Sequence, residues 1–91
     1  MAEEVKIIKF RVAGDPHGKA HTGLQPKGKR TARSLCRGVE MEVAEVVLDC
    51  GEWDECTICR MKRQNLVQEF GSLRDWAERE GYVVMDDLTG K

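Results

Sequence analysis

The sequence predicts a small α+β fold, in which a mixed three-stranded sheet is covered by two consecutive helices and carries a long basic loop. Three observations lead to this prediction. Apolar and charged residues alternate near the N-terminus, and two helical segments follow one another after residue 54. A region rich in glycine and cations, residues 14–38, lies between the N-terminal segment and the helices. With 91 residues, the chain is expected to be a single domain, 1–91, with a thin core, because short chains bury only about 60% of their unfolded surface.

Residues 5–13 are predicted to form the first strand. Ile8, Phe10 and Val12 alternate with a face that carries Lys9 and Arg11, as expected of a strand buried on one side. The Gly-Asp-Pro that follows should end the strand, since proline cannot donate to a β-ladder and glycine permits a positive φ.

Residues 14–38 are predicted to form a flexible basic arm. This region contains five glycines, two prolines and six Lys or Arg residues, and loops of this length are usually functional or disordered. Cations spaced along a flexible backbone can follow phosphates and release counterions. The candidate nucleic-acid-binding residues are therefore Lys27, Lys29, Arg30, Arg33 and Arg37. The alternative is a solvated loop, or one folded back on the acidic half of the chain.

Residues 39–49 are predicted to form the second strand, although their apolar residues also fit one face of a helix. Four valines favour the strand, because branched Cβ atoms suit a pleated sheet. Residues 55–70 are then predicted to form the first helix, with Asp54 as the N-cap. Arg63 falls within the apolar stripe of this helix, so either it extends its charge toward solvent or the helix starts later than residue 55.

Residues 73–80 are predicted to form the second helix, because Ser72 is suited to cap its start and Gly81 to end it. Trp76 lies on the apolar side of this helix, where it is better explained as a core anchor than as a platform for stacking bases. The short apolar run 82–85 is predicted to be the third strand.

Three of the four cysteines are concentrated in residues 49–59, and Cys56 and Cys59 form a CxxC pair. Tetrahedral zinc needs four soft or borderline ligands, and a CxxC turn brings two thiolates to one ion. We therefore predict one zinc ion bound by Cys36, Cys50, Cys56 and Cys59. His17 or His21 could replace Cys36 in a Cys3His site. A disulfide arrangement and inert buried thiols are the other interpretations.

The same CxxC pair also permits a thiol redox or sulfur-transfer enzyme. Cys56 would attack and Cys59 would resolve, because a helix N-terminus favours a thiolate. Three neighbouring carboxylates, Glu52, Asp54 and Glu55, would oppose that thiolate. An enzyme is therefore the second hypothesis, and the chain contains no GxxxxGK[ST], GxSxG or HExxH motif.

The charges are unevenly distributed along the chain. Residues 1–37 hold nine Lys or Arg against three Asp or Glu, and residues 38–91 hold six against thirteen. This asymmetry favours a small metal-stabilised nucleic-acid-binding or nucleoprotein adaptor protein, with DNA or RNA on the basic arm and a protein partner or a second copy on the acidic half. A protein-protein adaptor without nucleic acid is the third hypothesis.

Two further expectations follow from composition. The chain has no apolar run long enough to span a bilayer and no apolar leader segment, which predicts a cytoplasmic protein without a membrane partner. Its 34% charged residues and low Asn and Gln content are in the direction of thermophile proteins.

Overall fold

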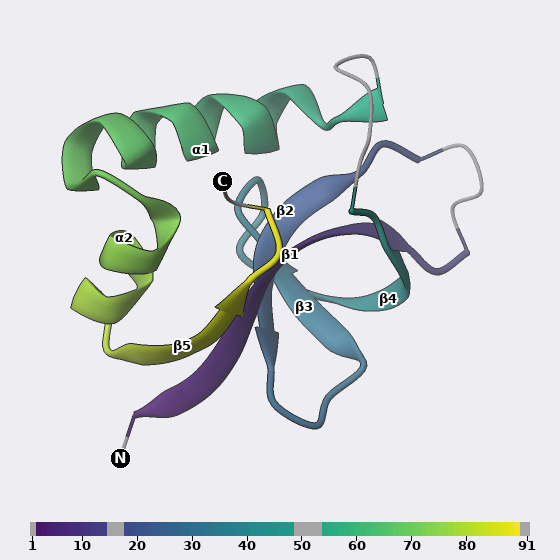
Figure 1. Ribbon diagram of the computed structural model, residues 1–91. Helices are drawn as coiled ribbons and strands as arrows, with labels where there is room; N and C mark the ends of the chain where they lie inside the picture. Colours follow the sequence, from purple (N-terminus) through teal and green to yellow (C-terminus); the bar gives the residue numbers. More distant parts are fainter. Residues whose placement is uncertain (1, 15–17, 49–53, 90–91) are drawn as a thin grey trace.

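The computed structural model describes residues 2–14, 18–48 and 54–89 (Figure 1). Five strands and two helices are present in this part of the chain. In order they are β1 (Glu3–Val12), β2 (His21–Pro26), β3 (Thr31–Ser34), β4 (Glu40–Val46), α1 (Thr57–Phe70), α2 (Leu73–Arg79) and β5 (Tyr82–Asp87).

Strands β1 to β4 close into a small antiparallel barrel, to which β5 adds in parallel. β1 is the central strand because it pairs with three others. Its residue Phe10 pairs with both His21 of β2 and Val46 of β4, and Val5 pairs with both β2 and Val84 of β5. One edge of β1 therefore belongs to β2, and the other edge is divided between β5 and β4.

The two faces of β1 contribute to two apolar clusters. Val5 and Ile7 pack with Leu73 and Ala77 of α2, and this cluster also includes Leu24 and Val84. Ile8 and Phe10 pack with Ala32 of β3, with side chains of β4 beside them. The α2 helix lies beside β5, and α1 crosses the top of the view over the strands (Figure 1).

The predicted three-stranded sheet is wrong, and so is the flexible basic loop over 14–38. That region supplies β2 and β3, half of the barrel. Apart from Leu24, its buried residues are small. Thr22, Ala32 and Ser34 are almost inaccessible to solvent, so no run of large apolar residues marks these strands.

Close approach of β2 to β3 requires a glycine. Gly23 pairs with Ser34, and a Cβ at Gly23 would overlap the Arg33 carbonyl oxygen and lie 2.8 Å from its carbon. Glycine in a strand often marks such an approach of two backbones. A residue that suggested a loop in the sequence is therefore required for barrel pairing.

The remaining elements have nearly the predicted positions. Of the ambiguous region 39–49, Glu40–Val46 form a strand and Asp49 lies outside the described residues, and the last strand extends to Asp87. The second helix ends at Arg79 and has the predicted Ser72 cap, whose hydroxyl accepts a 3.0 Å hydrogen bond from the Asp75 amide.

The first helix starts at Thr57 rather than residue 55, and its N-cap is Cys56 instead of Asp54. Among the residues of α1, Cys59 alone is buried. Ile58 and Met61 are each more than half exposed. The helix therefore has little apolar anchoring to the barrel.

Candidate metal centre

Four potential metal ligands from three parts of the fold lie together. His21 is the first residue of β2, Cys36 lies in the turn after β3, Cys56 caps α1, and Cys59 lies in its first turn. One ligand atom from each of these residues lies within 4.8 Å of all the others. The group could therefore hold a metal ion.

Backbone pairing brings His21 to the CxxC segment. Ala20 forms an isolated parallel bridge with Glu55. The Ala20 amide donates to the Asp54 carbonyl at 2.6 Å, and the Cys56 amide donates to the Ala20 carbonyl at 2.8 Å. The residue after Ala20 is therefore held beside the start of α1.

A second set of backbone bonds fixes Cys36. The Leu35 amide donates to the Thr22 carbonyl at 2.8 Å, which ties the turn to β2. The Gly38 amide donates to the Ser34 carbonyl at 2.8 Å and closes the turn. Gly38 has a φ of +68°, a conformation that glycine adopts without strain.

Two of the distances between ligand atoms agree with tetrahedral coordination. The His21 Nδ1 atom lies 3.5 Å from the Cys36 Sγ and 3.6 Å from the Cys59 Sγ. In tetrahedral zinc sites, bonds of about 2.3 Å to sulfur and about 2.0 Å to nitrogen separate these two ligand atoms by about 3.5 Å. These two distances are those that one ion would require, with Nδ1 as the imidazole ligand.

The thiols differ in their readiness to ionise. Burial raises the pKa of Cys59 to about 12, and its sulfur lies 3.8 Å from the Thr22 carbonyl oxygen. Burial alone would raise the pKa of Cys36. Hydrogen bonds with Ser34 and the neighbouring thiols, together with the charge of Arg37, lower this pKa by more, so that it lies below the ordinary value. A metal ion would have to displace the proton of Cys59.

A buried carboxylate anchors the start of α1. Only 4% of the Glu55 side chain is exposed, and its two oxygens lie 2.8 Å from the Lys9 Nζ and 3.0 Å from the Arg63 Nη2. Arg63 therefore pairs with Glu55 instead of extending its charge toward solvent. Because two cations neutralise Glu55, its charge opposes a nearby thiolate less than the sequence suggested.

The structure brings together three of the four cysteines predicted as ligands, Cys36, Cys56 and Cys59. Cys50 and His17 lie outside the described residues. The sequence indicated His21 as a substitute for Cys36, whereas the structure places both side chains in one group. The pairing of Ala20 with Glu55, which has no signature in the sequence, produces this arrangement.

The predicted nucleic-acid-binding cations are all exposed. Lys27, Lys29 and Arg30 lie in the β2–β3 connection, Arg33 lies on β3, and Arg37 follows it. Lys27 pairs with Glu4 at 3.2 Å and Lys29 with Glu40 at 4.0 Å, both at exposed positions. Such exposed pairs stabilise a fold by at most about 1 kcal/mol, so a phosphate could replace them.

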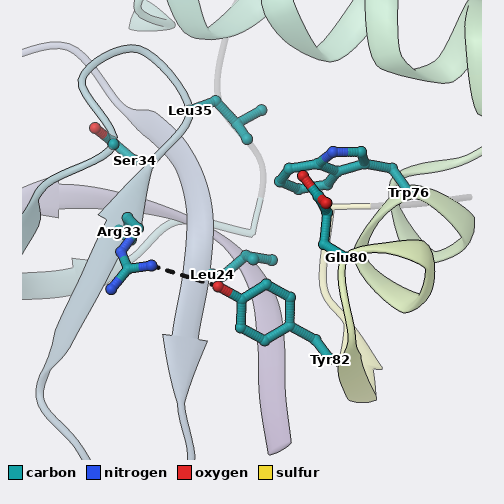
Figure 2. A pocket seen from close by; sticks show the side chains of 8 residues that line it. Leu24, Arg33, Ser34, Leu35, Trp76, Glu80 and Tyr82 are labelled. Carbon is teal, nitrogen blue, oxygen red and sulfur yellow. Dashed lines mark hydrogen bonds between the residues drawn. The ribbon is translucent and has the colours of Figure 1, made fainter. Parts of the chain in front are cut away.

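Three of these cations, Lys27, Lys29 and Arg33, lie on the β2–β3 hairpin (residues 21–34, the basic hairpin) and line three surface hollows that share residues. The first is a cleft of about 390 Å³ between β3 and α2, with Arg33 on its β3 side (Figure 2). A smaller hollow shares Leu24, Arg33 and Tyr82 with it. A third shares Pro26 and Lys29 with the second, and Lys27 also lines it. The first two hollows therefore adjoin at Arg33. The third, lined by Lys6 and Gln25, lies on the other face of β1 and β2 and meets the second at the edge formed by Pro26 and Lys29.

A scan of protein-family models, a search of curated proteins and a search of solved structures each return no match to this chain. Neither α1 nor α2, the helices in the part of the chain that the structure describes, has the length and apolar character needed to cross a membrane.

Proposed function

We propose that this is a small zinc-stabilised protein that binds single-stranded nucleic acid along its basic hairpin. The observation that carries the proposal is the series of three neighbouring hollows lined by Arg33, Lys29 and Lys27, which runs from between β3 and α2 around the edge of the basic hairpin. A flexible strand can follow such a path, whereas a rigid duplex would contact only its rim.

Zinc is the metal that suits this donor set best. Three thiolates and one imidazole form a common structural zinc site, and four protein ligands leave no position for a catalytic water. The ion would join α1 to β2 and to the turn after β3. This role is supported by the small buried area of α1, whose one buried residue among those described is the ligand Cys59.

The cations of the hairpin supply the phosphate contacts. Lys27, Lys29 and Arg30 sit in a short exposed connection, where their side chains contribute little to the core. Each phosphate that they neutralise on a single strand releases about 0.7 counterions. This mode of binding reads the backbone and is independent of base sequence.

The test replaces Lys27, Lys29 and Arg30 with glutamine and measures the affinity for an oligothymidylate over a range of salt concentrations. If all three contact phosphates, the slope of log affinity against log salt becomes shallower by about 2 units. The thermal midpoint of the zinc-loaded variant should remain close to that of the parent.

A matched control removes three cations elsewhere. Lys62, Arg74 and Arg79 are exposed on the helices, and their replacement by glutamine changes the net charge by the same amount. This variant should keep the parental slope. Equal slopes in both triple variants and the parent would overturn the proposal and favour a protein-protein adaptor.

Metal analysis with a free-thiol count separates zinc binding from the thiol-chemistry hypothesis. One zinc per chain, with Cys36, Cys56 and Cys59 protected from alkylation, supports the zinc site. Metal-free protein in which Cys56 and Cys59 cycle between dithiol and disulfide would favour redox or sulfur transfer instead. Burial raises the pKa of Cys59 to about 12, which argues against that second outcome because a resolving thiol attacks as the thiolate.

A further inference from the structure

The cleft between β3 and α2, the first of the three hollows, combines aromatic and charged side chains. Trp76 and Glu80 come from α2, Leu35 and Arg33 lie on the opposite side, and Tyr82 lies below them (Figure 2). Its volume of about 390 Å³ is at the lower end of the range for small-molecule sites. The cleft is therefore of a size suited to a ligand such as one nucleotide.

Trp76, Leu35 and Tyr82 are only partly buried. They pack against the apolar cluster that includes Leu73 and Ala77, and they also line the cleft. Trp76 thus contributes to the core as the sequence predicted, and it also presents part of its indole to the cleft. A planar ligand entering between Trp76 and Leu35 would have an aromatic surface on one side and an aliphatic surface on the other.

The charged groups lie on opposite walls. The guanidinium of Arg33 is on the β3 side, where it donates to the Tyr82 hydroxyl at 3.4 Å, and the carboxylate of Glu80 is on the α2 side (Figure 2). One wall therefore donates hydrogen bonds and the other accepts them. Among the bases, guanine has two adjacent acceptors, O6 and N7, on one edge, and two adjacent donors, N1–H and the amino group, beyond O6.

We infer that this cleft binds one unstacked guanine of a single strand, stacked on Trp76, with Arg33 donating to O6 and N7 and Glu80 accepting from N1–H and the amino group. The inference rests on the proposed function and adds base selectivity to it. Because Arg33 also borders the hollow that leads to Lys29, a strand held in the cleft could continue along the hairpin cations.

The test uses the zinc-loaded full chain carrying Trp53→Phe, so that Trp76 is the one remaining tryptophan. Fluorescence of Trp76 is titrated with an oligothymidylate containing one central guanosine, with the all-thymidine oligomer, and with a version carrying adenosine at the same position. The guanosine oligomer should quench Trp76 and bind most tightly. Stacking on one aromatic ring predicts that Trp76→Ala weakens the binding of this oligomer by about 5-fold to about 150-fold, measured by the anisotropy of a labelled oligomer because the variant has no tryptophan.

Glu80→Gln provides a variant that should not disturb folding, because Glu80 is exposed. It should abolish the preference for guanosine over adenosine, measured as the ratio of the affinities for the two oligomers. Glu78→Gln, on the same helix but outside the cleft, should keep the preference.

The outcomes separate the inference from the proposed function. Salt-dependent binding that is equal for all three oligomers and does not change Trp76 fluorescence would overturn the guanine site and leave backbone binding intact. Quenching by 5′-GMP that Glu80→Gln weakens, without salt-dependent binding of any oligomer, would overturn nucleic-acid binding and support a site for the free nucleotide. Absence of both responses would overturn both.

Discussion

Replacing His21 distinguishes the ligand set in the structure from the one predicted by the sequence. The structure groups His21 with Cys36, Cys56 and Cys59, and the sequence pattern placed Cys50 where His21 stands. Apparent zinc-binding energies of structural sites are about 10 to 16 kcal/mol, which averages to about 2.5 to 4 kcal/mol per ligand. We therefore expect His21→Ala to weaken zinc binding about 10²- to 10³-fold.

The assay is competition with a chromophoric chelator, accompanied by cobalt substitution. Thiolate-to-cobalt charge-transfer absorption increases with the number of sulfur ligands, so the parent should show the intensity of three thiolates. Cys50→Ser should keep both the affinity and this spectrum, and His17→Ala serves as the control for removing a histidine. His21→Cys should restore tight binding with a fourth thiolate.

The opposite pattern would refute the reasoning. If Cys50→Ser loses zinc about 10²-fold or more while His21→Ala keeps it, the all-cysteine set is correct. The short distances from the His21 Nδ1 to two sulfurs would then reflect hydrogen bonding rather than a position suited to coordination.

Three further predictions concern the barrel, the buried ion pairs and the coupling of zinc to protons. Gly23→Ala should lower the free energy of unfolding by about 1 to 3 kcal/mol in denaturant titrations, because the new methyl group overlaps β3. Gly28 has a φ of +77° and open space around it, and asparagine tolerates a positive φ, so Gly28→Asn should change this free energy little. Glu55→Gln should cost about 1.5 to 3 kcal/mol by the same measurement, since it removes the carboxylate that two cations share, and Glu45→Gln, in an exposed pair, should cost less than about 1 kcal/mol. Zinc affinity should rise with pH through the neutral range, because burial raises the pKa of Cys59 to about 12 and the metal must displace its proton; competition titrations at several pH values would contradict this if the affinity stayed constant.

The sequence predicts best where a local pattern coincides with packing. The alternation around Phe10 identified β1, and the Ser72 cap identified the start of α2. The barrel was missed because, apart from Leu24, burial in β2 and β3 falls on small residues such as Thr22 and Ala32. Composition alone cannot distinguish such strands from a glycine-rich loop.

The candidate site was predicted in part for a similar reason. The CxxC spacing marks Cys56 and Cys59 as a pair whatever the fold, since both lie on one turn of chain. The addition of His21 depends on contact between Ala20 and Glu55, which are far apart in sequence. The helical periodicity of α1 also suggested a buried stripe, but this helix borders the metal group rather than a large apolar core.

The ligand spacing along the chain has a kinetic consequence for folding. Cys56 and Cys59 can bind a metal ion in the unfolded chain, because closing so short a loop is entropically cheap. His21 lies 38 residues before Cys59, and it joins the group only after β2 has paired with β1 and reached the start of α1. Pairing of distant strands is slow compared with local closure. Zinc capture should therefore proceed in two steps, rapid weak binding to the CxxC segment followed by slower tightening of the site. The rate of the second step should be independent of zinc concentration, because it is the rate at which the barrel forms.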